Sequence, residues 1–289
     1  MNSVVELEGW QAKLNLAFEQ RAQHDEPKNS RTVLTNKQHF GPLVVQKPFY
    51  PEGAVCHVYI IHPPGGVVGG DTLSINVTNH HQSQALITTP AANKFYRSGG
   101  PVAQLDQTLT IEENASLEWL PQETILFNGC AVHSTTRINL NPNSRFTGWE
   151  ITCLGRPASG EAFNHGEFRQ RYEIYKEDKP LFIERAFLKG GHPILQAAWG
   201  LQNFTVTATM TVYPADKTLL ELARAAISEH AIIKNNNALY SATLIDQVLV
   251  CRYLGHHAEQ AKQIFTSVWA ALRPACLHRE ACMPRIWKT

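Results

Sequence analysis

The loop His62–Asp71 holds residues that could bind a cation, and its sequence is HPPGGVVGGD. Two prolines stiffen the chain, and the glycines allow positive φ angles or the close approach of another backbone. The glycine spacing nearly fits a phosphate-binding P-loop, but Asp71 stands where that motif needs a basic residue, and its carboxylate repels phosphate. The loop therefore indicates either a site for a hard or borderline cation or only a tight turn into the next strand.

Other potential metal ligands do not form a complete site by their spacing. The adjacent histidines His80 and His81 point in different directions on a regular strand or helix. Cys130 and His133 together supply only part of a closed zinc-type site. The sequence also contains no HExxH motif and no GxSxG nucleophile motif. We therefore find no complete active site among the residues.

Three isolated carboxylates, Glu123, Glu150 and Glu161, lie in or beside apolar stretches typical of β-strands. Such a carboxylate is either a solvent-facing member of the alternating pattern or a buried functional group, and the alternation favours the solvent-facing interpretation. Arg156 and Glu161 flank a Pro/Ser/Gly turn, so they could simply pair across it. The segment Lys94–Gly100 (KFYRSGG) suits either a partner contact or a capped strand end.

The composition excludes several classes of protein. The 289 residues are 43% hydrophobic, which is enough for a substantial core, and 26 Lys and Arg nearly balance 25 Asp and Glu. This balance argues against nucleic-acid binding, which needs concentrated positive charge. The longest uncharged stretches, such as Val55–Gly70, are interrupted by prolines and glycines and do not predict a membrane span.

Met1–Trp10 has neither the basic start nor the apolar segment of an export signal. We therefore expect a cytoplasmic protein whose six cysteines are reduced thiols.

Most segments of the chain predict β-strands. They alternate, or run apolar, with β-branched and aromatic residues, and Gly, Pro and Asn turns separate them. We find no repeat of fixed period and no linker, so we expect a single domain over residues 1–289. Single strands are predicted at Val55–His62, Asp71–Thr78, Ala85–Thr89, Gln104–Ile111, Thr135–Leu140 and Phe146–Leu154, and hairpins or bent strands at Glu167–Leu188 and Leu201–Tyr213.

Two amphipathic helices are predicted in the C-terminal third. Asp216 can cap the first, and the second begins near His256 and stops at Arg273–Pro274, because proline disfavours the helical conformation of the residue before it. We expect both helices to close one end of the β core, with partner binding as the alternative. The apolar faces consist of Leu219, Leu222, Ala223, Ala226 and Ile227, and of Ala261, Ile264, Phe265, Val268 and Leu272.

Several segments, taken in order, resemble one family along essentially the whole chain. They are GWQAKLNLAF, QHFGPLVV, QKPFYP, CHVYIIHPPGGVVGGD, TPAANKFYR, LEWLPQETILF, LGRPASGEAFNHG and the PRIW segment that ends at Trp287. Together they resemble the urease accessory proteins called UreD or UreH.

The resemblance implies a non-enzymatic accessory protein that helps to insert nickel into apo-urease. Family members assemble with the accessory proteins UreF and UreG on the urease subunits UreA, UreB and UreC, and UreG is the GTPase that delivers the metal. The resemblance implies a mostly β protein with a stacked, β-helix-like wound sheet and two late α-helices. It implies no tightly bound cofactor, only transient Ni²⁺, and neither nucleic acid nor membrane as a partner.

A nickel path through such a protein needs weak, successive ligands, because a closed high-affinity site would retain the ion. Our candidates for this path are the carboxylates Asp71, Glu123, Glu150 and Glu161. Asp71, Glu161 and Glu123 rest on the GGD, GE and LPQETI segments of the resemblance. Candidates for a structural role or a partner contact are Lys94, Tyr96, Arg97, Arg156, Gly65, Gly66, Gly69 and Gly70.

Three alternatives stay open. A pure assembly scaffold would need no contact with nickel. A glycoside hydrolase would need two carboxylates at a defined separation across a groove. A nickel-storage protein predicts a histidine-rich tract, which this sequence lacks.

Overall fold

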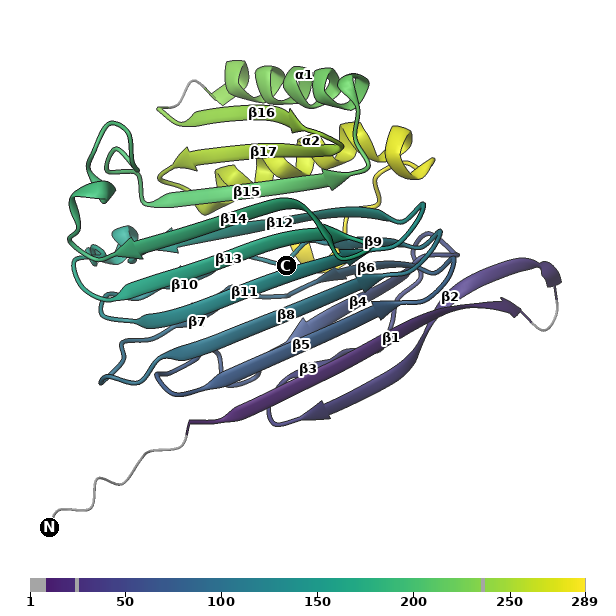
Figure 1. The fold of residues 1–289 in the computed structure, drawn as a ribbon, viewed down its shortest axis with the longest axis horizontal. Helices are drawn as coiled ribbons and strands as arrows, with labels where there is room; N and C mark the ends of the chain where they lie inside the picture. The colour runs from purple at the N-terminus through teal and green to yellow at the C-terminus, as the bar shows by residue number, and fades with distance from the viewer. Residues whose placement is uncertain (1–8, 24–25, 235–236, 289) are drawn as a thin grey trace, which may run out of the picture.

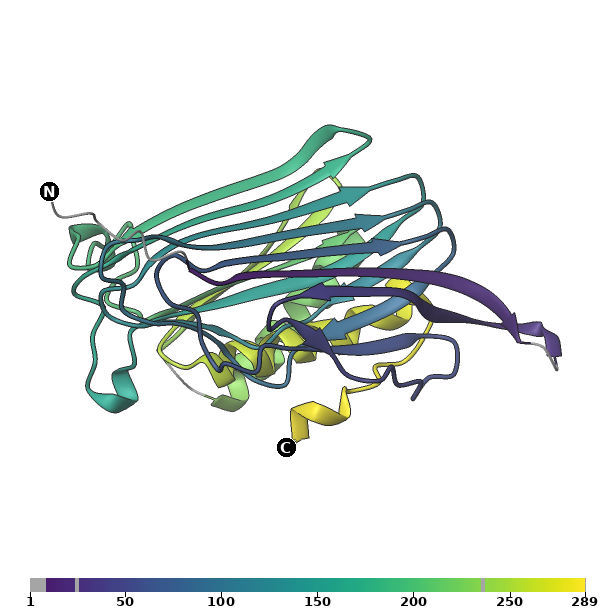
Figure 2. The ribbon, with the colours of Figure 1, turned by 90° about the horizontal axis from the view of Figure 1, so that it is seen from below.

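The chain winds back and forth between two facing β-sheets (Figure 1), which the computed structural model describes over residues 9–23, 26–234 and 237–288. One sheet has seven strands in the order β14-β13-β11-β8-β5-β1-β2. The other has ten strands, eight of them in the order β16-β17-β15-β12-β9-β6-β4-β3, with β10 and β7 attached beside β12. Seen from below in Figure 2, the sheets form two layers.

The strands up to the end of the winding are β1 (Gln11–Gln23), β2 (Glu26–Phe40), β3 (Val44–Val45), β4 (Cys56–Ile61), β5 (Thr72–Asn79), β6 (Gln84–Thr88), β7 (Asn93–Phe95), β8 (Ala103–Ile111), β9 (Ser116–Trp119), β10 (Thr124–Leu126), β11 (Ala131–Leu140), β12 (Arg145–Leu154) and β13 (Glu167–Lys176). The later elements are β14 (Lys179–Lys189), β15 (Val206–Tyr213), α1 (Lys217–Lys234), β16 (Leu239–Ile245), β17 (Val248–Gly255) and α2 (Ala258–Leu277). Short 3₁₀ turns cover Pro157–Ser159, Pro193–Leu195 and Arg285–Lys288.

Strands of successive turns pair in a regular parallel register, but the turns differ in their number of residues. Strands β4, β6, β9 and β12 pair in parallel in one sheet, and β5, β8, β11 and β13 pair in parallel in the other. Thr72 lies opposite Gln104, Gln104 opposite His133, and His133 opposite Arg169, so successive turns contain unequal numbers of residues. The expected mostly β, stacked and wound architecture is confirmed, and the unequal turns explain why the sequence has no fixed period.

The core between the sheets follows from alternation along each strand. In β5, Leu73, Ile75 and Val77 are buried while the residues between them are not, because neighbouring side chains point to opposite faces. The same pattern in β8 and β11 turns apolar side chains toward the facing sheet. Removal of these side chains from water is the main term that holds the two layers together.

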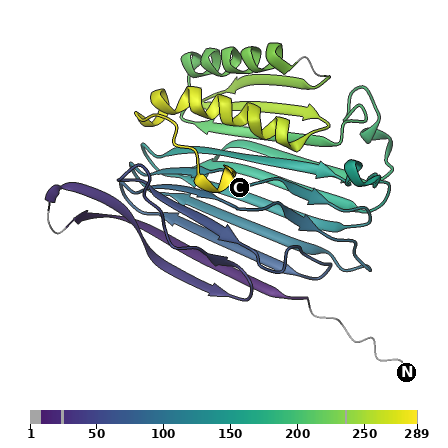
Figure 3. The ribbon, with the colours of Figure 1, turned by 180° about the vertical axis from the view of Figure 1, so that it is seen from behind.

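Both predicted helices exist, and they pack side by side on the outer face of the ten-stranded sheet (Figure 3). The backbone N–H of Leu219 donates to Asp216 Oδ1 at 2.9 Å, so the predicted cap of α1 is confirmed. The whole predicted apolar face of α2 is buried, but on α1 the assignment of Leu222 was wrong, because that side chain is 38% exposed. Within the described residues, no helix is long and apolar enough to cross a bilayer.

The predicted stop of the second helix at Arg273–Pro274 was wrong. Helix α2 continues through Pro274 to Leu277, and His278 ends it in a left-handed conformation. The buried guanidinium of Arg273 binds Glu118 on β9 and Glu52 in the turn before β4, and these contacts outweigh the local preference of a residue that precedes proline.

Several predicted strands need smaller corrections. The hairpin predicted at Glu167–Leu188 is confirmed as β13 and β14. The segment Leu201–Tyr213 forms neither a hairpin nor a long bent strand, because turns occupy its first part and only β15 follows. The sequence prediction missed the long hairpin of β1 and β2, which projects beyond the other strands in Figures 1 and 2. The expectation of no export signal concerns Met1–Trp10, and residues 1–8 lie outside the described residues.

Candidate functional site

Two interior cavities meet inside the wound sheets. The larger, about 180 Å³, is lined by inward side chains of both sheets, including Leu73, Gln107 and Phe168, and reaches His62 and Gly65 at the loops. The smaller, about 90 Å³, lies toward β14 and β15. Both cavities are lined by Glu150, Thr152 and Gln170, so these three residues form the wall that the cavities share.

Glu150 is held in this shared wall by side chains of the facing sheet. The hydroxyl of Thr136 on β11 and the amide of Gln170 on β13 each donate to one carboxylate oxygen of Glu150. Gln107 on β8 donates in turn to the Thr136 hydroxyl at 2.8 Å. The carboxylate on β12 is therefore oriented by three successive strands of the opposite sheet.

The protein interior changes the protonation of Glu150. Burial raises the pKa of its carboxyl to about 7, although hydrogen bonds from Thr136 and Gln170 act to lower it. The negative charge of Glu184 nearby raises it further. Near neutral pH the carboxyl thus exchanges a proton readily, and a cation could take the place of that proton.

The sequence analysis favoured a solvent-facing Glu150, and that interpretation was wrong. The side chain keeps some accessible surface because it lines the interior cavities. The alternation of side chains along β12 could have predicted this inward orientation. Phe146 and Leu154 belong to the core between the sheets, and each is four residues from Glu150, so all three side chains point to the same face. The pattern was obscured because the other face of β12 is apolar too, with Trp149 and Ile151 buried under the helices.

A second interior carboxylate, Glu184 on β14, was missed entirely. It lines the smaller cavity, where Thr209 on β15 donates to its Oε1 at 3.3 Å and Arg252 on β17 donates to its Oε2. The same period of two was a usable signal, because Phe182 and Leu188 are buried on the face that carries Glu184.

Asp71 has a structural role in the glycine-rich loop. Its Oδ1 accepts a hydrogen bond from the backbone N–H of Trp10 at 2.8 Å, and its Oδ2 accepts one from Val68 at 3.0 Å. The predicted close backbone approach is present, because a Cβ added to Gly9 would lie 2.1 Å from the carbonyl carbon of Gly70. Asp71 thus joins the start of β1 to the loop, and it does not line either cavity.

Arg156 and Glu161 pair across their turn. Arg156 Nε donates to Glu161 Oε2, and the backbone N–H of Asn128 donates to Oε1 at 3.0 Å. The guanidinium of Arg156 also lies over the ring of Phe127, 4.1 Å from its centroid. Both oxygens of Glu161 are therefore engaged, and the pair fastens one loop to the next.

The remaining candidates belong to the same stack of loops, at the left-hand end of the sheets in Figure 1. The ring of Tyr96 covers Gly66 so closely that a Cβ there would lie 2.2 Å from Tyr96 Cε2. Tyr96 also meets the ring of Phe127 edge to face at 4.8 Å. Gly69 contacts Ser98 and Pro101, and Gly65 and Gly70 have positive φ angles. The backbone N–H of Val67 donates a hydrogen bond to the carbonyl oxygen of Lys94. The side chain of Arg97 lies over Gly129.

Glu123 stands beside the larger cavity but does not line it. Burial lowers the pKa of Lys262 on α2, and the negative charge of Glu123 partly offsets this effect. The structure therefore separates the predicted carboxylates, with Glu150 in the interior and Asp71, Glu123 and Glu161 elsewhere. Within the described residues, no three His, Cys, Asp or Glu side chains form a group that could hold a metal ion.

Comparison with known proteins decides the family. A family model described as UreD urease accessory protein matches residues 11–288. The urease accessory protein UreD of Alcanivorax borkumensis is 45% identical over 282 residues, which cover 97% of this chain and 93% of that protein. The protein of the same name from Citrobacter koseri is 43% identical, over 97% of this chain and 92% of its own length. The chain belongs to the UreD family.

The family and these relatives are all described as urease accessory proteins. Membership supports a role in urease maturation. The motifs that carried the resemblance to UreD, such as HPPGGVVGGD and GRPASGE, fall mostly in the stacked loops. Their structural contacts explain much of their composition.

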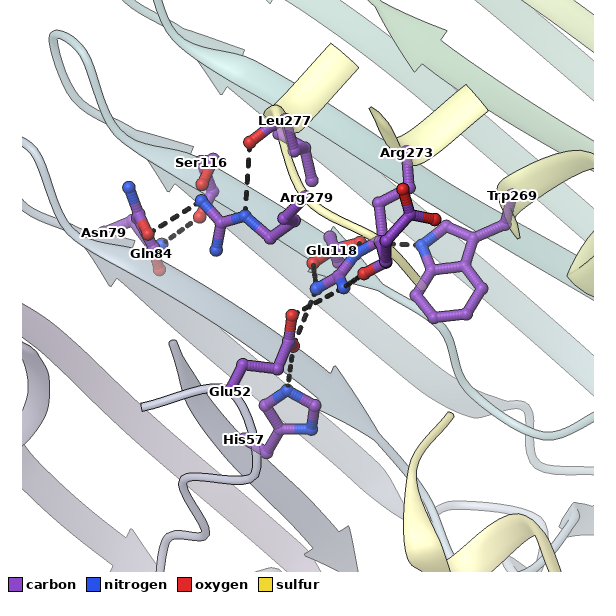
Figure 4. A network of polar contacts seen from close by, with 11 residues as sticks. Glu52, His57, Asn79, Gln84, Ser116, Glu118, Trp269, Arg273, Leu277 and Arg279 are labelled. Carbon is purple, nitrogen blue, oxygen red and sulfur yellow. Dashed lines mark hydrogen bonds and ion pairs between the residues drawn. The ribbon is translucent and has the colours of Figure 1, made fainter. Parts of the chain in front are cut away.

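A buried ionic network of this UreD-family chain was also missed by sequence reasoning (Figure 4). Arg273 on α2 binds Glu52 at 2.6 Å and Glu118 on β9 at 2.9 Å. Trp269 donates to Glu118 Oε1 at 2.6 Å, and His57 Nε2 lies 2.6 Å from Glu52 Oε1. Burial acts to raise the pKa of Glu52, but hydrogen bonds from His57 and Arg273 prevail and hold it at about 2. These residues come from distant parts of the chain, so no local sequence pattern predicts that they meet.

Proposed function

We propose that this UreD-family chain helps to mature urease by passing Ni²⁺ through its interior toward apo-urease. It would act in the cytoplasm as part of a complex with UreF and UreG on the subunits UreA, UreB and UreC. The single observation that carries the nickel path is the position of Glu150, which stands in the wall shared by two interior cavities.

The chemistry of this wall suits a passing cation. Ni²⁺ accepts carboxylate oxygens as ligands, and the Glu150 carboxylate is oriented by the hydroxyl of Thr136 and the amide N–H of Gln170. A carboxyl whose pKa is about 7 releases its proton when a cation arrives and takes one up when the cation leaves. Such a site binds weakly, which transit requires.

Glu184 supplies a second carboxylate farther along the interior. It lines the smaller cavity, and its charge is close enough to raise the pKa of Glu150. Two carboxylates in succession would let the ion move from one to the next without a closed site. Arg252 forms an ion pair with Glu184, so a passing ion would have to compete with that guanidinium.

A pure assembly scaffold is the second candidate function. It is favoured by Asp71 and Glu161, whose carboxylate oxygens are all engaged by backbone amides or by Arg156. In that case the loop motifs would preserve the fold and a partner surface, and nickel would never contact this chain.

Urease activation in cells separates the two candidates. A strain that lacks its own copy of the protein receives the wild type, Glu150→Gln, or the matched control Glu113→Gln on an exposed turn. Urease activity is measured beside co-purification of UreF, UreG and the urease subunits. We expect Glu150→Gln to lower activity at least about tenfold with the complex intact, and the control to keep it.

Full activity of Glu150→Gln with an intact complex would leave only the scaffold role. If the strain without the protein kept full urease activity, the proposed role in maturation itself would be wrong.

A further inference from the structure

The outer face of the seven-stranded sheet is open over β11, β13 and β14. Both α-helices pack against the other sheet, and within the described residues none covers this face. Arginines gather on it: Arg169, Arg171 and Arg185 are all exposed and alternate with inward residues along their strands.

Two of these arginines directly oppose each other. Arg171 on β13 is the cross-strand partner of Arg185 on β14, an arrangement of like charges that lowers the stability of a sheet. Glu173 binds Arg171 at 2.6 Å and relieves part of this repulsion. Arg185 has no carboxylate partner among the described residues. The face therefore keeps an unneutralised positive charge at a place where it costs stability.

Apolar side chains and a hollow accompany the charge. Ile183 and Phe187 on β14 are 42% and 47% exposed, and the guanidinium of Arg169 lies over the Phe187 ring, 4.5 Å from its centroid. A groove of about 290 Å³ on the same face is lined by Arg169, Arg171 and neighbouring residues of β8 and β11. Arginine and exposed aromatic side chains next to a hollow are typical of the energetic centre of protein interfaces.

We propose that this arginine face, formed by Arg169, Arg171, Ile183, Arg185 and Phe187, binds an acidic segment of a partner protein that also carries an apolar side chain. The carboxylates of the segment would neutralise Arg185 and Arg171, and its apolar side chain would cover Phe187 and Ile183. A protein segment fits better than a nucleic acid, because the exposed apolar side chains lie within the charged patch and Asp106 lines the groove. This inference is independent of the nickel path.

The test uses the full chain and a fluorescein-labelled peptide of glutamates around a single phenylalanine. Binding is measured by fluorescence anisotropy, with a lysine peptide and a single-stranded RNA as competing probes. The variants are Arg185→Glu and Phe187→Ser. Lys13→Glu is the matched control, because Lys13 is exposed on the same sheet, on β1, with β5, β8 and β11 between it and β13.

We expect Arg185→Glu to weaken binding of the acidic peptide at least about tenfold, and Phe187→Ser to weaken it severalfold without a change of charge. Arg185→Glu should also raise the melting temperature by about 1–3 °C, because the new carboxylate faces Arg171. Lys13→Glu should leave binding unchanged.

Weaker binding together with a higher melting temperature separates a binding surface from a purely structural one. Failure of the acidic peptide to bind the wild type would overturn the proposal. So would an equal loss with Lys13→Glu, which indicates unspecific attraction, or tighter binding of the RNA than of the acidic peptide.

Discussion

Arg273 on α2 donates two hydrogen bonds to Glu118 on β9, one to each carboxylate oxygen, and both N–O distances are 2.9 Å. The same guanidinium binds Glu52, so one buried cation joins the C-terminal part of the helix to strand β9 and to the turn that precedes β4. This network fixes where α2 lies on the sheet, and it explains why the helix continues past Pro274.

Replacement of Arg273 by an uncharged residue should lower the stability of the folded protein. Arg273→Met would leave Glu118 buried without a counter-charge and Glu52 with only His57 beside it, and we expect the free energy of unfolding to fall by about 3–5 kcal/mol. Urea denaturation followed by circular dichroism measures it. Arg224→Met on α1 is the matched control, since Arg224 is an exposed partner of Glu221 and should change stability by less than about 0.5 kcal/mol. Equal effects of the two variants would contradict the network's importance.

Glu150 should make stability depend on pH in a definite direction. Burial raises its pKa from an ordinary 4.5 to about 7 in the folded protein, so the folded state binds the proton more tightly than the unfolded state. Stability from this group is complete below about pH 4.5 and is lost as pH rises through about 7. Glu150→Gln carries no such charge and should therefore be more stable than the wild type at pH 8, by about 1–3 kcal/mol.

Thermal melting at pH 5 and pH 8 checks this expectation, with Glu113→Gln as the control on an exposed turn. The difference between Glu150→Gln and wild type should be larger at pH 8. A difference that is equal at both pH values would mean that Glu150 titrates normally.

Asp71 should behave as a structural residue. Asp71→Ala leaves the backbone amides of Trp10 and Val68 without their acceptor, and we expect a loss of about 1–3 kcal/mol in stability. Asp71→Asn keeps one acceptor oxygen and should lose less. Hydrogen exchange at the Trp10 amide reports the change directly, since exchange should be faster in Asp71→Ala. If Asp71→Ala lost urease activation but kept its stability and its hydrogen-exchange rate at the Trp10 amide, Asp71 would instead have a direct role in nickel transfer.

Gly66 and Tyr96 should be coupled. A Cβ at Gly66 would overlap the Tyr96 ring, and the backbone φ there is not strained, so the clash alone should make Gly66→Ala destabilising by about 1–3 kcal/mol. Removal of the ring in the double variant Gly66→Ala/Tyr96→Ala should cancel most of that clash. A double-mutant cycle in urea measures the coupling, and strict additivity would contradict this contact.

The sequence predicted the architecture well where local pattern decides it. Alternation in β5, β8 and β11 and the apolar face of α2 were sufficient, because each pattern depends on one strand or one helix. It failed at Arg273–Pro274, where Glu52 and Glu118, far away in the sequence, hold the helix together. A local rule has no information on such contacts.

The candidate site shows the same limit. Glu150 could be named from the sequence, but its position between two cavities depends on Thr136 and Gln170 from the opposite sheet. Glu184 had the right spacing beside Phe182 and Leu188 and was overlooked because β14 was not resolved as a separate strand. Asp71 was selected as a candidate because it follows a glycine-rich segment. The glycines of this segment are explained by the close packing of the loops.

The most direct test of the nickel path counts metal atoms in urease. Urease is purified from cells that carry wild type, Glu150→Leu or Glu113→Gln, and nickel per urease active site is measured by mass spectrometry, after co-purification of the accessory complex is verified. The path through the interior predicts nickel-poor urease with Glu150→Leu and full loading with the control. Full nickel loading by Glu150→Leu in an intact complex would contradict it.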